Sequence, residues 1–219
     1  MGIFRHFFTA CVVALITILG SGSRSHAQVL FTEQFNGGVG AGWSIVRSNA
    51  SYYSYSPTSL TLRANSRTIL QSNNTANNLF LISTPTAGNF QIDVRVELFS
   101  PSAAVYPQFH LLAYDDDNNY MKMGCGRYSA GDAGLRLEVN REVGAVLGGS
   151  SDGGGDGGGF DQKNFGSAPF WLRMVKMGNF YSEYWSTNGV DYFRNGRPLN
   201  YGDGTPTKWG GPRSSARVA

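Results

Sequence analysis

Strict two-residue alternation of apolar and polar side chains is the feature that most constrains how this chain can fold. In "NFQIDVRVELF" (89–99), apolar residues at every second position from Ile92 to Leu98 alternate with charged ones, and "GLRLEVN" (134–140) repeats the pattern. Successive side chains of a strand point to opposite faces of its sheet, so each segment predicts a strand with one buried and one wet face. Helical periodicity is nearly absent.

The later part of the chain continues this pattern. "APFWLRMVKMGNFYSEYWSTNGVDYF" (168–193) predicts three strands that turn at Gly178-Asn179 and at Asn188-Gly189. Asn-Gly is a strong hairpin signal because both residues tolerate the left-handed region. "LGGSSDGGGDGGGFD" (147–161) predicts a flexible loop between strands. The expected fold class is all-β, a two-sheet antiparallel jelly-roll sandwich.

Residues 1–27 read as a signal peptide. A short basic start precedes an apolar run that is too short to span a bilayer, and small residues follow it. Residues 28–193 are then expected to form one sandwich domain in a secreted or periplasmic monomer. No other stretch is apolar for long enough to cross a membrane. A retained membrane anchor is the alternative reading of residues 1–27.

Composition excludes several classes of function. Residues 28–193 carry 11 basic and 14 acidic side chains, which disfavours a phosphate-binding surface, so no nucleic-acid partner is expected. Outside the predicted signal, Cys125 is the only cysteine and His110 the only histidine. An intramolecular disulfide and a cysteine-based zinc site are therefore excluded. A serine–histidine–acid triad would have to use His110, and no G-x-S-x-G stretch supports one.

The segment "RNGRPLNYGDGTPTKWGGPRSSARVA" (194–219) has almost no strand pattern. We expect an irregular basic tail here and a sandwich that lacks its last strand. The loss of that strand would expose the edge of one sheet.

"AYDDDNNYMKMG" (113–124) places a cluster of acids between two strand patterns. Strands over 106–114 and 120–124 predict a hairpin with a five-residue loop, because Asp and Asn side chains bond to local backbone. A structural calcium site on Asp115, Asp116 and Asp117 is the alternative, since calcium takes clustered oxygens. No other cofactor is expected.

This hairpin register assigns its two faces. Phe109, Leu111, Ala113, Met121 and Met123 share the apolar face. The opposite face offers the aromatic rings and hydrogen-bonding groups that sugars require. Its candidate ligand-binding residues are Gln108, His110, Tyr114, Tyr120 and Lys122, together with Arg136, Glu138 and Asn140 of the next strand pattern. The alternative is a solvated face whose charges pair across strands.

Three stretches in order, "NNLFLISTPTAGNFQIDVRVE", "FHLLAYDDDNNYMKMG" and "APFWLRMVKMGNFYSEYWSTNGVDY", resemble the concanavalin A-like domain found at the C-terminus of many β-xylosidases. They also resemble its free-standing relatives of unknown function, grouped with the regulation-of-enolase family. The resemblance covers about residues 30 to 193. It implies a jelly-roll sandwich that accompanies carbohydrate-active enzymes, with the aspartate hairpin as a structural feature.

The function expected from these observations is secreted, non-catalytic binding of a polysaccharide, associated with polysaccharide degradation. A glycoside hydrolase or polysaccharide lyase on the same scaffold is one alternative, using acids such as Glu138 and Glu142. Glycanases of this architecture carry acids along one strand as Glu-x-Asp-x-x-Glu, and nothing here matches that motif. A structural or adhesive surface protein is the other alternative.

Overall fold

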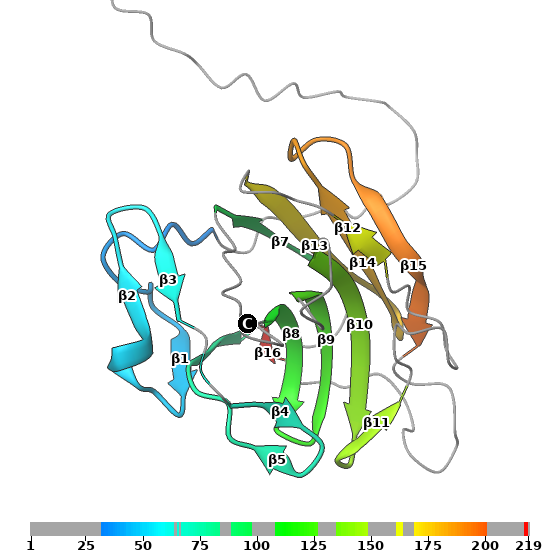
Figure 1. Ribbon diagram of the computed structural model, residues 1–219, viewed down its shortest axis with the longest axis horizontal. Helices are drawn as coiled ribbons and strands as arrows, with labels where there is room; N and C mark the ends of the chain where they lie inside the picture. The colour runs from blue at the N-terminus through cyan, green and yellow to red at the C-terminus, as the bar shows by residue number, and fades with distance from the viewer. Residues whose placement is uncertain are drawn as a thin grey trace, which may run out of the picture. The chain divides into compact units, whose positions relative to one another are not determined.

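The alternating segments form the strands of two antiparallel sheets in the computed structural model (Figure 1). It describes residues 32–63, 65, 67–83, 89–97, 108–126, 135–148, 161–163, 169–200 and 217–218. Residues 33–219 form one unit, and Thr32 is the only described residue of the preceding 32. The predicted signal peptide and residues 149–160 of the predicted glycine-rich loop lie outside the described residues.

The larger sheet has eight strands in the order β1-β6-β16-β8-β9-β10-β11, and β12 also pairs with β10. The strands are β1 (Trp43–Val46), β6 (Leu79–Ser83), β16 (Arg217–Val218), β8 (Gln108–Asp116), β9 (Asn119–Gly126), β10 (Leu135–Val143), β11 (Val146–Gly148) and β12 (Asp161–Lys163). The predicted register of the aspartate hairpin is confirmed, with Tyr114 opposite Tyr120 and Leu112 opposite Lys122. The strands extend to Asp116 and from Asn119, so the turn is shorter than predicted.

The smaller sheet has the order β15-β14-β13-β7. Its strands are β7 (Phe90–Val96), β13 (Phe170–Met177), β14 (Phe180–Ser186) and β15 (Phe193–Asn200). The prediction of irregular structure from residue 194 is wrong over 194–200, because this segment pairs with β14. β15 is an edge strand, where a proline such as Pro198 is tolerated. The two residues of β16 likewise pair with β6 and β8.

The main core lies between the two sheets and confirms the predicted alternation. Leu111, Ala113, Met121 and Met123 of the larger sheet are buried. They belong to one cluster with the following buried residues of the smaller sheet: Val96, Phe170, Leu172, Met174 and Tyr181. At about 1.5–3 kcal/mol for each large apolar side chain, this burial is the main favourable contribution to folding. The observed architecture is therefore the predicted β-sandwich.

Short elements from the first part of the chain complete the fold. They are the helical turn η1 (Ala50–Tyr52), the hairpin of β2 (Tyr53–Tyr55) and β3 (Leu60–Leu62), and the hairpin of β4 (Ile69–Leu70) and β5 (Asn73–Asn74). In Figure 1 the β4–β5 hairpin lies at the ends of β8 and β9. No helix in the described ranges is long and apolar enough to cross a membrane.

One carboxyl group lies inside the main core. Glu183 of β14 is 1% exposed and accepts a hydrogen bond of 2.7 Å from Asn195 Nδ2. Its Oε1 has no hydrogen-bond partner among the residues that the structure describes. Burial raises the pKa of Glu183 well above its usual value of 4.5, since an unshielded anion is costly in an apolar interior.

We expect the stability contributed by Glu183 to be fully present below pH 4.5 and to be lost as the pH rises through the folded-state pKa. Because the folded state holds the proton more tightly, the free energy of unfolding falls with rising pH by at most about 1.4 kcal/mol per pH unit. Glu183→Gln should remove this slope. Urea unfolding of both proteins from pH 4 to pH 8 tests it, and parallel pH curves would contradict the assignment.

Candidate functional site

The outer face of the larger sheet carries most of the predicted ligand-binding residues in successive cross-strand rows. His110 of β8, Gly124 of β9 and Glu138 of β10 form one row, and Gln108, Gly126 and Arg136 form the next. Figure 1 shows these three strands side by side. A glycine inside a strand often marks a place where another group approaches the backbone closely. The two glycines leave the central strand without side chains between the flanking polar groups.

Gly124 allows His110 and Glu138 to meet across the central strand. A Cβ atom on Gly124 would lie 2.9 Å from His110 Cδ2 and 2.8 Å from His110 Cα. His110 Nε2 contacts Glu138 Oε1, and Lys122 Nζ lies 3.0 Å from the same oxygen. The three side chains are only 13%, 7% and 9% exposed, respectively, so this ion cluster is shielded from solvent.

The cluster favours a neutral imidazole. Burial disfavours the imidazolium and the nearby Lys122 ammonium repels it, so the pKa of His110 is lowered from 6.5 although Glu138 opposes the shift. Lys122 already supplies the positive charge that the Glu138 carboxylate needs. Neutral His110 therefore donates its Nε2 proton to Glu138 and keeps a lone pair on Nδ1.

Asn140 lies beside this cluster and has an unused acceptor. It is the cross-strand partner of Lys122 on β10, in the row next to His110 and Glu138. Asn140 is 6% exposed, and no residue of the described part of the chain donates a hydrogen bond to its Oδ1. Leaving a buried acceptor unpaired costs about 1–3 kcal/mol. Any hydrogen-bond donor that reached this atom would satisfy it.

The prediction that Tyr114 and Tyr120 belong to a wet surface is wrong. They are 6% and 0% exposed, in a second apolar cluster with Leu79, Leu81 and Leu112. No sequence pattern indicates that the β4–β5 hairpin covers this end of the face. The Tyr120 hydroxyl lies within hydrogen-bonding distance of two acceptors, Ile69 O and Glu142 Oε2, the latter at 2.8 Å. The ring faces of both tyrosines are therefore covered by protein.

Glu142 shares this covered end of the face. Its Oε2 accepts the Gln71 backbone N–H at 2.7 Å, while its Oε1 is buried with no donor among the described residues. Gln71 has a φ of 55°, in the left-handed region that costs a non-glycine residue free energy. The hydrogen bond to Glu142 helps to hold this turn in place.

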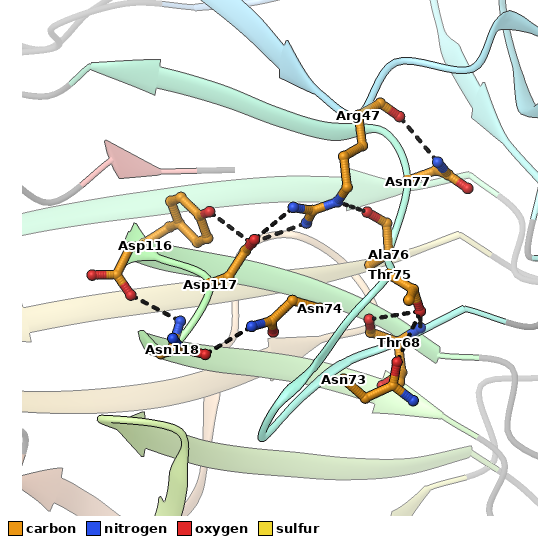
Figure 2. A network of polar contacts seen from close by, with 11 residues as sticks. Arg47, Thr68, Asn73, Asn74, Thr75, Ala76, Asn77, Asp116, Asp117 and Asn118 are labelled. Atoms are coloured by element: carbon orange, nitrogen blue, oxygen red, sulfur yellow. Dashed lines mark hydrogen bonds and ion pairs between the residues drawn. The ribbon is translucent and has the colours of Figure 1, made fainter.

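The aspartates of the hairpin form a structural joint. Arg47, at the end of β1, donates from both guanidinium NH2 groups to Asp117 at 2.6 and 2.9 Å and from Nε to Ala76 O at 2.5 Å (Figure 2). Tyr114 also donates to Asp117. Burial alone would raise the pKa of Asp117, but the bonds from Arg47 and Tyr114 lower it below its usual value. Arg47 thus ties β1 and the segment before β6 to the β8–β9 turn.

The carboxyl group of Asp116 forms hydrogen bonds with residues of its own turn. It accepts hydrogen bonds from Asn118 N at 2.8 Å and from Asn119 Nδ2 at 2.7 Å, which closes the turn. The side-chain amides of Asn118 and Asn74 contact each other at 2.7 Å (Figure 2). No group of three or more His, Cys, Asp or Glu side chains in the described ranges is placed to hold a metal ion.

The structure thus brings together His110, Lys122 and Glu138 and places Gln108 and Arg136 in the adjoining row. It separates Tyr114 and Tyr120 from them by burial. Sequence reasoning missed the two glycines, although the run "MKMGCG" (121–126) contains the signal. Glycine at alternate positions of a strand that otherwise bears Met and Lys indicates a face over which neighbouring side chains approach.

The sequence matches no known protein-family model, and no curated protein matches it. Solved structures do resemble its fold. The GH43 protein BlXynB of Bacillus licheniformis superposes with a TM-score of 0.61 at 18% identity, over 89% of this chain and 40% of that one. The xylan β-1,4-xylosidase of Bacillus halodurans C-125 superposes with a TM-score of 0.58 at 13% identity, over 90% of this chain and 36% of that one. The Bacteroides ovatus xyloglucan PUL GH43B superposes with a TM-score of 0.57 at 11% identity, over 89% of this chain and 36% of that one.

These similarities establish a β-sandwich fold related to a part of glycoside hydrolase family 43 proteins. The chain spans about two fifths of the length of those proteins.

Proposed function

We propose that this chain is an exported glycan-binding β-sandwich that accompanies polysaccharide-degrading enzymes. The glycan would bind on the outer face of β8, β9 and β10. The structural neighbours include a xylan β-1,4-xylosidase and a xyloglucan GH43 protein, which supports this association. The order of the motifs along the chain supports a place within the concanavalin A-like group.

The unsatisfied Asn140 Oδ1 is the observation that carries the proposal. It lies in the row next to the His110–Glu138–Lys122 cluster. On the same face, the central strand β9 carries Gly124 and Gly126, which have no side chains. Sugars present several hydroxyl donors and acceptors in a small volume, which suits one orphan acceptor among charged groups. With both tyrosines covered, we expect recognition through hydrogen bonds more than through aromatic stacking.

Hydrolysis by paired acids has little support from the strand geometry. Glu138 and Glu142 are four residues apart on β10, so a rise of about 3.3 Å per residue separates them by about 13 Å. Glycosidases place their two carboxyl groups about 5–9.5 Å apart. In addition, Glu142 is held by Tyr120 and Gln71 beneath the β4–β5 hairpin. We therefore propose that the chain has no glycosidase activity.

Asn140→Leu tests the binding face because its effects on stability and on binding should have opposite signs. Replacing an unpaired buried acceptor with an apolar group of similar volume should leave the fold unchanged or more stable. Loss of the hydrogen bond to the glycan should weaken binding by about tenfold. Calorimetric titration with xylan, xyloglucan, β-glucan and polyuronate fragments measures the affinity, and urea unfolding measures the stability.

Gln91→Ala is the matched control, since Gln91 is an exposed polar residue on β7 of the other sheet. It should bind as the unmodified protein does. Binding by Asn140→Leu at full affinity would place the glycan elsewhere on the molecule. Absence of binding to every polysaccharide would refute the proposed function.

A further inference from the structure

We propose a second glycan-binding surface on this chain, on the outer face of the smaller sheet. One cross-strand row of that face runs through all four strands (Figure 1), from Asp93 of β7 through Arg173 of β13 and Tyr184 of β14 to Arg194 of β15. Tyr192, in the loop before β15, packs against the same row. These five residues form a tyrosine platform. An uncharged polysaccharide would lie across it, with its sugar rings stacked on the two tyrosines.

The tyrosine platform is open to solvent, unlike the ion cluster on the larger sheet. Arg194 is exposed, and the side chain of Asp93 is 40% exposed. Tyr184 and Tyr192 are half-buried, so part of each ring is in contact with water. In the adjoining loop, Val190 is 78% exposed. A polymer can therefore reach this face from solvent.

Tyr184 is the unengaged aromatic residue of the tyrosine platform. Among the described residues, its side chain forms no hydrogen bond, ring stacking or cation–π contact. Its cross-strand neighbours are Arg173 on one side and Arg194 on the other. Arg194 likewise forms no ion pair within the described part of the chain. A tyrosine ring beside a free guanidinium offers a stacking surface and N–H donors, which suit the C–H face and the hydroxyl groups of a sugar.

Tyr192 is held in place by its surroundings. The Arg173 guanidinium lies 3.5 Å from the centre of the Tyr192 ring, and it donates hydrogen bonds of 2.6 and 2.9 Å to Asp93. The preceding loop is closed by Ser186, whose Oγ accepts from Gly189 N at 2.9 Å. Within the described chain, Arg173 is the only ring contact of Tyr192, so the other face of the ring is left for a ligand. A ring that is already immobilised loses little conformational entropy on binding.

The charges of this face balance, which favours an uncharged ligand. Among the described residues, three arginines and three carboxyl groups lie on the face or in the loop beside it: Arg95, Arg173, Arg194, Asp93, Glu97 and Asp191. Arg95 pairs with Glu97 at 2.8 Å, as Arg173 does with Asp93 at 2.6 Å. Asp191 accepts from Asn188 Nδ2 at 2.8 Å. A face without excess charge does not attract a polyanion, so a neutral polysaccharide is the expected ligand.

The test is a calorimetric titration of the full chain, without its predicted signal peptide, with xylohexaose and cellohexaose as neutral probes. Tyr184→Ala and Tyr192→Ala should each weaken binding by about tenfold, because each removes a stacking ring. Tyr184→Phe keeps the ring and should bind within about twofold of the unmodified protein. Tyr52→Ala is the matched control, since Tyr52 is a half-buried tyrosine of η1, outside both sheets. Gln91→Ala should also bind normally, because Gln91 lies opposite Val175 in the next row.

Arg194→Ala is a second variant that decides the question if Tyr184→Ala fails to fold, because Arg194 is exposed. It should weaken binding of a neutral probe by about fivefold, through the loss of hydrogen bonds to sugar hydroxyls. Raising the NaCl concentration from about 50 mM to about 500 mM should change the affinity by less than about twofold, because salt screens only the attraction between charges. An oligogalacturonate, as the acidic probe, should bind no more tightly than the neutral probes.

The tyrosine platform and the site of the proposed function share only the premise that the chain binds a glycan, and Asn140→Leu separates them. Weaker binding in Tyr184→Ala and Tyr192→Ala, with Tyr184→Phe and Tyr52→Ala unchanged, supports the tyrosine platform whatever Asn140→Leu does. Full affinity in both alanine variants would overturn it, and a loss in Asn140→Leu alone would then leave the proposed function intact.

Two further results would overturn the tyrosine platform. One is binding of the acidic probe alone. The other is a dimer in light scattering that Tyr184→Ala separates, since a second copy of the chain would then occupy this face. Binding of no glycan would refute both this surface and the proposed function.

Discussion

Gly124→Ala is expected to lower the free energy of unfolding by about 3 kcal/mol and to separate His110 from Glu138. The added Cβ would lie 2.8 Å from His110 Cα and closer still to the Phe109 carbonyl oxygen. Both are backbone atoms of the neighbouring strand, so no rotamer change can relieve the contact. β8 would have to move away from β9, in the middle of the larger sheet.

Equilibrium unfolding in urea measures this loss. Gly38→Ala is the matched control, because a Cβ on Gly38 would meet nothing within 4 Å. Its effect should stay within about 0.5 kcal/mol. If Gly124→Ala were as stable as the control, the close approach of β8 over Gly124 would be wrong, and with it the contact between His110 and Glu138.

Tyr120→Ala is expected to cost about 4 kcal/mol, the range for removing a large buried aromatic ring. Tyr120 is 0% exposed and packs in the cluster beneath the β4–β5 hairpin. Its hydroxyl also bonds to Ile69 O and Glu142 Oε2. The substitution would create a cavity and would leave Glu142 with the Gln71 N–H as its remaining donor among the described residues.

Tyr120→Phe separates the two contributions. It keeps the ring and removes only the hydroxyl, so we expect a loss of about 1–3 kcal/mol from the unpaired buried carboxylate. Tyr184→Phe, on the outer face of the smaller sheet, should change stability by less than about 0.5 kcal/mol. Equal effects of the two Tyr→Phe substitutions would show that the Tyr120 hydroxyl is not engaged as described.

Local periodicity was sufficient to predict the inner faces of the strands. Leu111 and Met123 are buried where the alternation placed them, and Tyr114 lies opposite Tyr120 in the predicted register. A one-residue slip would expose every apolar side chain of a strand, so the pattern determines the register strongly. The charged outer face of β10 was predicted for the same reason.

The cover on the outer face could not be predicted in this way. Strands β4 and β5 have two residues each, too few to show a period. Their docking depends on backbone groups such as the Gln71 N–H and Ile69 O, which every sequence carries. The Arg47–Asp117 joint connects residues 70 positions apart, and no local pattern indicates that pairing.

The pairing of β7 with β13 also bears on how fast the chain can fold. It joins Val96 to Phe170 and Phe90 to Lys176, while β8 to β12 lie between them in sequence and belong to the other sheet. Such distant contacts must overcome loop-closure entropy before they gain free energy. The hairpins of β8 with β9 and of β13 with β14 can form early, whereas the pairing of β7 with β13 must await chain closure. Refolding should therefore take milliseconds to seconds, the range for sandwiches with mostly non-local contacts.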